Sequence, residues 1–372
     1  MQISYIIITH NAIKKRQSGN IISRILLENN LTFAGVSIAT ITEDFITNYI
    51  TLIEQNKSNI LSTTLSLLIN YIKNLLDTEA MFLFFIGNNA KKQTNAIIGD
   101  INNECDSDVI TMHDTFSSLS TKHFEPNVIS SPVFKNDYNY KTTKGEFELI
   151  LNLLESQSNV SKNNFKTQEQ SLVIIKPDMW QNNSLKPGII IDILSRIGLK
   201  MVGCKLHSIT SAEAQEFYQP VQDIIRNKIL SQTKEQMRSA LLGEFNLTLE
   251  EEQINKLATI INDKHANIQF EELIKFTQKK NINSEIKDSN YRFSCMAIVY
   301  QGENAISKIR QAIGVTDPSK AENKTIRKEF GTTIMKNAIH ASDSTENATR
   351  EMEIIKIQHN EIQNIIKNFI EQ

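Results

Sequence analysis

Cysteine is scarce in this chain of 372 residues, which contains only three. Cys105, Cys204 and Cys295 lie far apart, and none belongs to a CxxC pair. This spacing argues against a structural zinc site and against a disulfide framework. We therefore expect a protein of the reducing cytoplasm.

Glycine-rich phosphate loops and long apolar runs are also missing. No GxxxxGK(S/T) or GxGxxG segment occurs among the 12 glycines, so side chains would have to hold any nucleotide phosphates. No apolar stretch approaches the roughly 20 residues that span a bilayer. The run YIII near the amino terminus is too short for the core of a signal peptide. The sequence predicts a soluble protein without membrane contact.

The charges are nearly balanced, with 40 Lys and Arg against 42 Asp and Glu and a net charge of -2. No global basic field therefore favours nucleic acid as the main partner. Lys279 and Lys280 beside Asn281 form only a small basic patch, which is typical of a solvated turn. Any bound anion must be held by a local cluster of side chains.

The second half of the chain carries a regular alternation of strand and helix patterns. Strand, helix, strand, strand, helix and a long, polar-rich helical pattern are predicted in turn at residues 171–178, 187–197, 199–209, 293–300, 303–313 and 346–369. Between them, residues 219–290 are charged and helical. Thr248 to Glu251 (TLEE) is a capping box, followed by an apolar stripe of Ile254, Leu257 and Ile261. We expect a helical insertion packed on the domain surface.

The first 165 residues repeat this order of strand, loop, helix and strand. Residues 4–42 echo 171–210, and residues 80–100 echo 294–315. Tandem duplication is the economical explanation. The length of the chain also favours two domains. We expect a first domain at 1–154, a polar linker at about 155–166, and a second domain at 167–372 with its helical insertion at about 219–266.

A dense set of phosphate-compatible side chains lies between residues 310 and 351. Arginine forks and lysine charges suit phosphate oxygens, and a nearby histidine can act as base or nucleophile. The set comprises Arg310, Thr316, Lys320, Lys324, Arg327, Asn337, His340, Ser342, Asp343 and Glu351. Composition alone leaves open the alternative of a solvated charged face with an ordinary histidine.

The amino-acid sequence of this region resembles the signature of nucleoside diphosphate kinases. IRQAIGVTDPSKAENKTIRKEFG is followed by NAIHASDSTENATREME, in which residues 337–344 match the family's NIIHGSDS-type nucleophile segment. Residues 176–178 match its KPD strand end. The resemblance implies that His340 is the nucleophile, with Ser342 and Glu351 orienting its ring. It also implies a ferredoxin-like α+β fold with an antiparallel sheet.

The same register implies the nucleotide-binding residues. Arg310, Thr316 and Arg327 fall on the family's phosphate-binding positions, and Asn337 and Lys176 on those that contact sugar and phosphate. A magnesium ion would be held mainly by the nucleotide itself. The resemblance thus implies ping-pong phosphoryl transfer between nucleoside tri- and diphosphates, and a homo-oligomer.

Two further residues match positions of the family, and two features of the sequence depart from it. Tyr218 matches the family's active-site tyrosine, and Phe270 the aromatic residue that stacks on the base. The segment between them is greatly lengthened and would lie in the helical lid over the nucleotide. Ala341 stands where the family usually has glycine, which should be tolerated if the backbone there avoids positive φ.

The first half resembles a degenerate copy. Its nucleophile segment aligns as residues 127–130, with Ser130 in place of the histidine. Asn95 and Ile101 replace the phosphate-binding arginine and threonine, and residues 9–11 read THN instead of KPD. We expect a pseudo-domain that packs, regulates or oligomerises. A migrated site built on other histidines is the alternative.

Two other functions remain open for the whole chain. One is a catalytically weak nucleotide-binding regulatory or scaffold protein, in which the insertion or Ala341 has cost the second half its turnover. The other is nucleic-acid binding, which some members of the family also perform.

Overall fold

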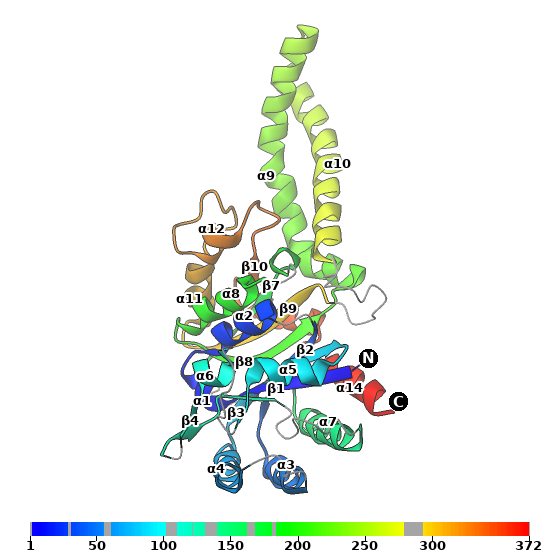
Figure 1. Ribbon diagram of the computed structural model, residues 1–372. Coiled ribbons are helices and arrows are strands. Elements are labelled where there is room, and N and C mark those ends of the chain that lie inside the picture. The colour runs from blue at the N-terminus through cyan, green and yellow to red at the C-terminus, as the bar shows by residue number, and fades with distance from the viewer. Residues whose placement is uncertain are drawn as a thin grey trace. The chain divides into compact units, whose positions relative to one another are not determined.

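The computed structural model describes residues 2–28, 31–55, 61–101, 110–120, 122–130, 140–161, 168–180, 184–278 and 293–371 (Figure 1). The chain divides into two compact units. One comprises Met1–His207 with Lys280–Gln372, and the other is Ser208–Lys279. Cys105 and the basic patch at residues 279–281 lie outside the described residues. No described helix is long and apolar enough to cross a membrane.

The second half of the chain builds a four-stranded sheet in the order β10-β7-β9-β8. Its strands are β7 (Glu169–Ile175), β8 (Lys200–His207), β9 (Cys295–Gly302) and β10 (Ile339–Ala341), and each paired neighbour is antiparallel. Counted along the chain, this is the fourth-first-third-second order of a ferredoxin-like unit. The predicted fold class is confirmed.

Two helices, α8 (Lys186–Ser195) and α11 (Ala305–Ile313), cover one face of this sheet. Ile191 and Leu194 of α8 and Ile309 of α11 are buried with Val173 and Ile175 of β7 in one core. These residues recur at helical spacing in α8 and at every second position in β7, so each element buries one side. The other side of the sheet, which carries the intervening residues, is left for the candidate site.

The first half repeats this architecture. Its strands β1 (Gln2–Ile8), β2 (Thr32–Thr40), β3 (Glu79–Gly87) and β6 (Val128–Ser130) form a sheet in the order β2-β3-β1-β6. That order is the same as in the second half when both are numbered along the chain. The helices α2 (Ser18–Glu28) and α5 (Ala90–Ile98) correspond to α8 and α11. The predicted tandem repeat is confirmed at the level of fold.

The remaining elements are short, or belong to the periphery of the two halves and to the helical unit. They are the helices α1 (His10–Lys14), α3 (Glu43–Gln55), α4 (Ser62–Lys73), α6 (Met112–Phe116), α7 (Tyr140–Glu155), α9 (Ser211–Phe245), α10 (Glu251–Thr277), α12 (Ile326–Phe330), α13 (Thr345–Ile354) and α14 (Ile362–Glu371), the 3-10 turn Pro177–Met179 and the hairpin of β4 (Ser118–Leu119) and β5 (Phe124–Glu125).

The two halves pack through equivalent elements. Helix α2 lies on α8, where the backbones meet at Gly19 and Gly188. A Cβ added at either glycine would lie 2.4 Å from the carbonyl oxygen of the other. The edge strands β2 and β8 also meet, and Asn360 Nδ2 donates to Val36 O (2.7 Å) and to Cys204 O (3.4 Å) there. Reciprocal contacts of this kind resemble a two-fold dimer interface within one chain.

The long helical pattern predicted at residues 346–369 is wrong, because two helices, α13 and α14, occupy it. The chain turns between them at Lys356, whose φ is 50°. The buried ammonium of Lys205 donates to the carbonyls of Lys356 (3.2 Å) and His359 (3.1 Å), which stabilises this turn. After the turn, α14 crosses to the first half, where Ile362 and Ile366 are buried in its second core.

The described part of the predicted linker, residues 155–161, packs at the interface between the two halves. Asn159 and Val160 are both 5% exposed, and Val160 forms a β-bridge with Gly203. Asn159 Oδ1 accepts hydrogen bonds from Ser37 (3.1 Å) and from Asn360 (2.9 Å). Asn159 and Val160 therefore pack in the interface between the halves.

The helical unit consists of α9 and α10, which run antiparallel, since Arg226 pairs with Asp263 and Arg238 with Glu251. The predicted cap at Thr248 is wrong. Glu250 caps α10, and its N–H donates to Gln253 Oε1 (3.0 Å).

The apolar stripe predicted on α10 is only partly buried. Ile254 is buried, but Leu257 and Ile261 are 40% and 48% exposed. The buried positions instead recur every four residues through Ala258, Asn262 and Ala266. Asn262 donates to the carbonyl of Arg226 in α9 (2.9 Å), so this row of mostly small side chains faces the partner helix.

Candidate functional site

His340 lies at the centre of β10, opposite Ile174 of β7. Its neighbours Ile339 and Ala341 are buried in the core that α8 and α11 cover. Because side chains alternate along a strand, His340 points to the other face of the sheet, where 20% of its side chain is exposed. Ala341 has no positive φ, so the condition for replacing glycine there is met.

A chain of polar contacts holds the imidazole of His340. Its Nε2 lies 3.0 Å from Glu351 Oε2, and Ser342 Oγ donates to the same oxygen (2.6 Å). Glu351 is buried in α13, and Ser342 follows β10 directly. The strand and the helix after it thus bring together the three residues predicted to hold and orient the nucleophile.

Lys176 and Asn337 form a second group at the end of β7. Lys176 Nζ donates to Asn337 Oδ1 (2.7 Å) and to the carbonyl of Met335 (3.2 Å). Asn337 Nδ2 in turn donates to the carbonyl of Thr316 (3.0 Å). Burial lowers the pKa of Lys176 to about 8, with Arg327 acting in the same direction and Asp178 against it.

Arg327 is largely buried in α12 and is bonded to backbone. Its guanidinium donates to the carbonyls of Ile339 (3.1 Å from Nη2) and Gly314 (2.9 Å from Nη1). It therefore ties β10 to the end of α11. The predicted phosphate-binding arginine also supports the strand that carries His340.

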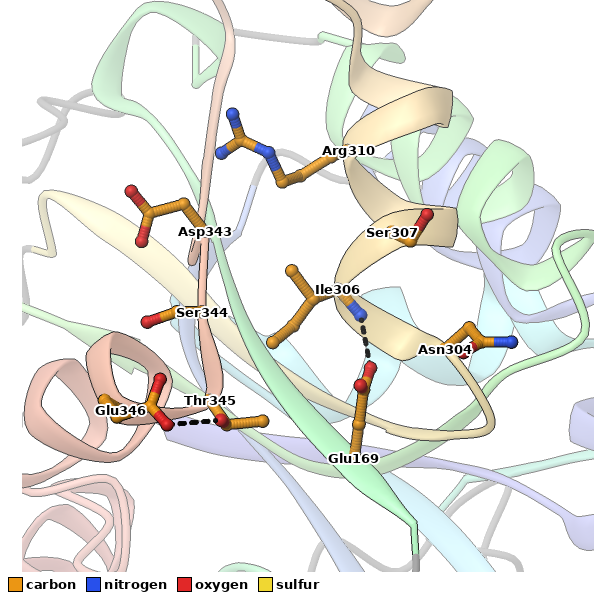
Figure 2. Close-up of a pocket in the computed structure, with 9 residues that line it drawn as sticks. All are labelled: Glu169, Asn304, Ile306, Ser307, Arg310, Asp343, Ser344, Thr345 and Glu346. Carbon is orange, nitrogen blue, oxygen red and sulfur yellow. Dashed lines mark hydrogen bonds between the residues drawn. The ribbon is translucent and has the colours of Figure 1, made fainter.

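Arg310 lies apart from these contacts, at an open cavity of about 510 Å³. Figure 2 shows its guanidinium extending from α11 toward the segment that carries Asp343. Among the described residues, no hydrogen bond or ion pair holds the guanidinium of Arg310, whose backbone carbonyl accepts from Gly314 N (3.1 Å). The cavity is lined by Glu169, Asn304, Ile306, Ser307, Arg310, Asp343, Ser344, Thr345 and Glu346. Arg310 and the exposed Thr316 thus present side chains that can accept a ligand.

Tyr218 and Phe270 belong to the helical unit. Tyr218 is buried in α9, with its ring 5.0 Å from that of Phe217, and Phe270 is half-buried in α10. Their roles toward a nucleotide stay predictions.

Asp178 is a site residue to which the sequence analysis gave no role. Its Oδ2 accepts a hydrogen bond from the N–H of Ala338 (3.0 Å), and burial raises its pKa. The only signal in the sequence was its place in the KPD triplet.

The pseudo-site of the first half differs from its prediction by one residue. Ile129 pairs with Ile7 of β1 as His340 pairs with Ile174 of β7, so Ile129 and not Ser130 occupies the histidine's position. Asn127 has the residue type of Asn337 but lies one position closer to the strand that follows it. Thr9 N donates to Asn127 O as Lys176 N donates to Ala338 O, which makes Asn127 the equivalent of Ala338.

The phosphate-binding cations are also replaced in the first half. Thr111 lies beneath Gly99 as Thr325 lies beneath Gly314, so His113, two residues on, takes the place of Arg327. Burial lowers the pKa of His113 to about 4. The face of the sheet equivalent to the His340 face is packed with apolar and aromatic side chains, including those of α3, α4, α7 and α14.

Comparisons with known proteins agree with this geometry. A family model described as nucleoside diphosphate kinase matches residues 169–242 and 236–362. A nucleoside diphosphate kinase of Bdellovibrio bacteriovorus is 28% identical over 191 residues, which cover 51% of this chain and 94% of the relative. That of Anaeromyxobacter sp. (strain K) is 30% identical over 187 residues, covering 50% and 86%. That of Dehalococcoides mccartyi (strain ATCC BAA-2266 / KCTC 15142 / 195) is 48% identical over 59 residues, covering 16% and 42%.

The matched region contains β7 to β10, His340 and the residues that contact it, and its two segments overlap at residues 236–242, within α9. Sequence and geometry agree in the second half, and by this match the chain belongs to the nucleoside diphosphate kinase family.

Proposed function

We propose that this chain is a nucleoside diphosphate kinase that transfers the γ-phosphoryl group of a nucleoside triphosphate to a nucleoside diphosphate through His340. The observation that carries the proposal is the contact of Nε2 of His340 with Glu351, itself hydrogen-bonded to Ser342. A carboxylate at this distance favours the tautomer that carries the ring proton on Nε2, and it orients the imidazole. The neutral tautomer then carries its nucleophilic lone pair on Nδ1.

The transfer divides into two similar half-reactions. The Nδ1 lone pair attacks the γ-phosphorus while the bond to the bridging β,γ-oxygen breaks, and the departing diphosphate keeps that electron pair. A second diphosphate then attacks the phosphorus of phospho-His340, and the nitrogen recovers its lone pair. One site thus serves two polyanions in turn, which a direct transfer could not do without holding both together.

The cations around His340 suit a polyphosphate. Lys176 and Arg310 supply charge, and Arg327 lies within hydrogen-bonding distance of the strand that carries His340. The charges of Lys176, Arg310 and Arg327 suit a polyphosphate that brings its own Mg²⁺. No cluster of three or more His, Cys, Asp or Glu in the described ranges could hold a metal ion. When bound, the ion would neutralise part of the charge on the phosphate oxygens. Asn337 and Thr316 would contact the nucleotide. For Tyr218 and Phe270 a role toward the nucleotide rests on the resemblance to the family.

We propose that the first half is a pseudo-domain that supports the second without transferring phosphate. Ile129 has no nucleophilic atom, and His113 at the place of Arg327 is buried, with a pKa lowered to about 4. The pairing of α2 with α8 supports a built-in dimer contact, and further association of whole chains into a homo-oligomer is part of the proposal. Cys204 and Cys295 are buried and outside any disulfide, which suits the reducing cytoplasm.

The alternative, a nucleotide-binding protein with little turnover, has one observation in its favour. The guanidinium of Arg327 donates to the carbonyls of Ile339 and Gly314, and these bonds would compete with a phosphate. The alternative predicts nucleotide binding without a phosphorylated enzyme.

Initial-rate kinetics test the proposal. Varying the triphosphate at several fixed diphosphate concentrations should give parallel double-reciprocal lines, and His340→Ala should abolish transfer. Intersecting lines, or full activity in the variant, would contradict a phosphohistidine intermediate.

A further inference from the structure

The backbone just before His340 is strained. Ala338 has a φ of 70°, and Ile339 N donates across it to Asn337 O (2.8 Å), which closes a three-residue γ-turn. The γ-turn with positive φ is rare, because the Cβ of an L-residue crowds the backbone there. Ala338 is fully buried, so the surrounding structure must hold it in this conformation.

Hydrogen bonds from β7 and the turn after it hold both polar groups of Ala338. The N–H of Ala338 donates to Asp178 Oδ2 (3.0 Å), and the carbonyl of Ala338 accepts from the N–H of Lys176 (2.9 Å). The bond from Lys176 is backbone to backbone and continues the strand pairing. Asp178 supplies the only side chain among the described residues that is hydrogen-bonded to Ala338.

The first half of the molecule shows what happens to this turn in the same fold without the histidine. Asn127 occupies the position of Ala338, and its φ is not positive, although asparagine tolerates positive φ better than alanine does. Asn11 stands at the position of Asp178, and Ile129 at that of His340. Entry into the fourth strand therefore does not require the strain. The strain and the aspartate occur together in the half that has the histidine.

We propose that Asp178 is a positioning residue for His340, which it serves by clamping the strained turn at Ala338. The inference rests on the proposed phosphotransfer at His340. With the clamp in place, the turn sets Asn337 and His340 at a fixed spacing on either side of Ala338 and Ile339. Without it, Ala338 relaxes toward negative φ, and the imidazole shifts relative to Lys176 and Asn337. Small displacements of a reacting group cost a large part of the rate.

A competing role for Asp178 is purely electrostatic, since its carboxylate raises the pKa of Lys176. Asparagine separates the two roles, because its side-chain oxygen still accepts the N–H of Ala338 but carries no charge. Glycine at position 338 separates them again, because glycine adopts positive φ without strain and needs no clamp.

The experiment compares Asp178→Ala, Asp178→Asn, Ala338→Gly and the double variant Asp178→Ala/Ala338→Gly, with Asn11→Ala as the matched control in the first half. Asp178→Ala should lower kcat roughly 10- to 100-fold, with the nucleotide KM changed less than about threefold. Asp178→Asn, Ala338→Gly and Asn11→Ala should stay near wild type, and the double variant should recover part of the lost kcat. Wild-type kcat in Asp178→Ala, or an equal loss in Asp178→Asn, would overturn the inference.

Amide hydrogen exchange at Ala338 gives a readout that does not depend on turnover. Exchange should accelerate in Asp178→Ala and stay slow in Asp178→Asn. Unchanged protection in Asp178→Ala would refute the clamp even in an active enzyme. If wild-type protein transfers no phosphate, the proposed function fails, and this exchange result still decides whether Asp178 holds the turn.

Discussion

His340 depends on a carboxylate that approaches it from the following helix. Glu351 is buried. Its carboxylate contacts Nε2 of the ring and accepts a hydrogen bond from Ser342, so its charge acts mainly on these two side chains. A hydrogen bond to a charged group in such a setting contributes more than a neutral one. We therefore expect Glu351 to orient the imidazole of His340 in the proposed reaction.

Glu351→Gln should slow phosphoryl transfer without abolishing it. The amide keeps the shape of the side chain but lacks the charge that favours a proton on Nε2, and kcat should fall roughly 10- to 100-fold. Single-turnover formation of phosphohistidine measures this step. Glu353→Gln, an exposed change on the same helix, is the control and should leave the rate unchanged. Equal rates in both variants would remove Glu351 from the mechanism.

The charge of Lys176 should set the alkaline limit of activity. Its pKa lies at about 8 instead of 10.5, chiefly because of burial. Lysine binds phosphate only when protonated, so kcat/KM, which reports the free enzyme, should fall about tenfold per unit as pH rises above 8. Lys176→Arg keeps its charge throughout this range, and the alkaline limb should vanish from its profile. A wild-type profile that stays flat to pH 10 would contradict the lowered pKa.

At this scale the sequence predicted much of the site. The register from Arg310 to Glu351 has no gap, so the contact between His340 and Glu351 could be read from the resemblance. The register of the first half could not, because one residue of slippage before β6 changes which side chain faces the site. The role of Asp178 could not be predicted either, because a side chain that accepts a hydrogen bond from a distant backbone N–H leaves no pattern in the sequence.

Helices α2 and α8 meet so closely that their glycines form part of the interface. Gly188→Ala would place its Cβ 2.4 Å from the carbonyl oxygen of Gly19, and the halves would have to separate to accommodate it. We expect a loss of about 1–3 kcal/mol in the free energy of unfolding. Gly243→Ala in α9, where a Cβ meets nothing within 4 Å, should instead gain about 0.5–1 kcal/mol. Urea unfolding measures both, and a neutral Gly188→Ala would argue against the close crossing.

The last helix completes the core of the first half. Ile366 of α14 is fully buried there, and Phe369 packs on Phe147 of α7 with ring centroids 5.3 Å apart. Ile366→Ala should therefore cost about 2–5 kcal/mol of unfolding free energy. The exposed neighbour Asn364→Ala should change it by less than about 0.5 kcal/mol. Similar urea midpoints for the two variants would show that α14 does not belong to this core.

The sequence predicted the helices and strands more reliably than the surfaces against which they pack. The spacing of apolar residues identified α8, α11 and the strands β7, β8 and β9, since periodicity reports which side of an element is buried. It does not report what covers that side. The apolar face of α14 was visible at residues 346–369, but its contact with a half of the chain more than 200 residues away was not. The turn at Lys356 was hidden because lysine at positive φ has no sequence signature.

The whole molecule contains two copies of one fold, of which one carries the candidate site. In the second half the face of the sheet beyond the core presents His340, whereas in the first half the same face is filled by Tyr5, Phe82, Phe84 and Phe147. A packed aromatic core leaves no room for a nucleotide. The shared interface and the crossing of α14 join the two halves into one compact unit. The first half can thus support the site without possessing one.

The most direct test of the central claim is labelling with γ-³²P-ATP, followed by acid or base treatment and a chase with unlabelled nucleoside diphosphate. The account predicts an acid-labile, base-stable label on wild-type protein that the chase transfers to the diphosphate, and no label on His340→Ala. Nucleotide binding without any label would contradict it and make the chain a binding protein. Label that persists in His340→Ala would place the chemistry on another residue.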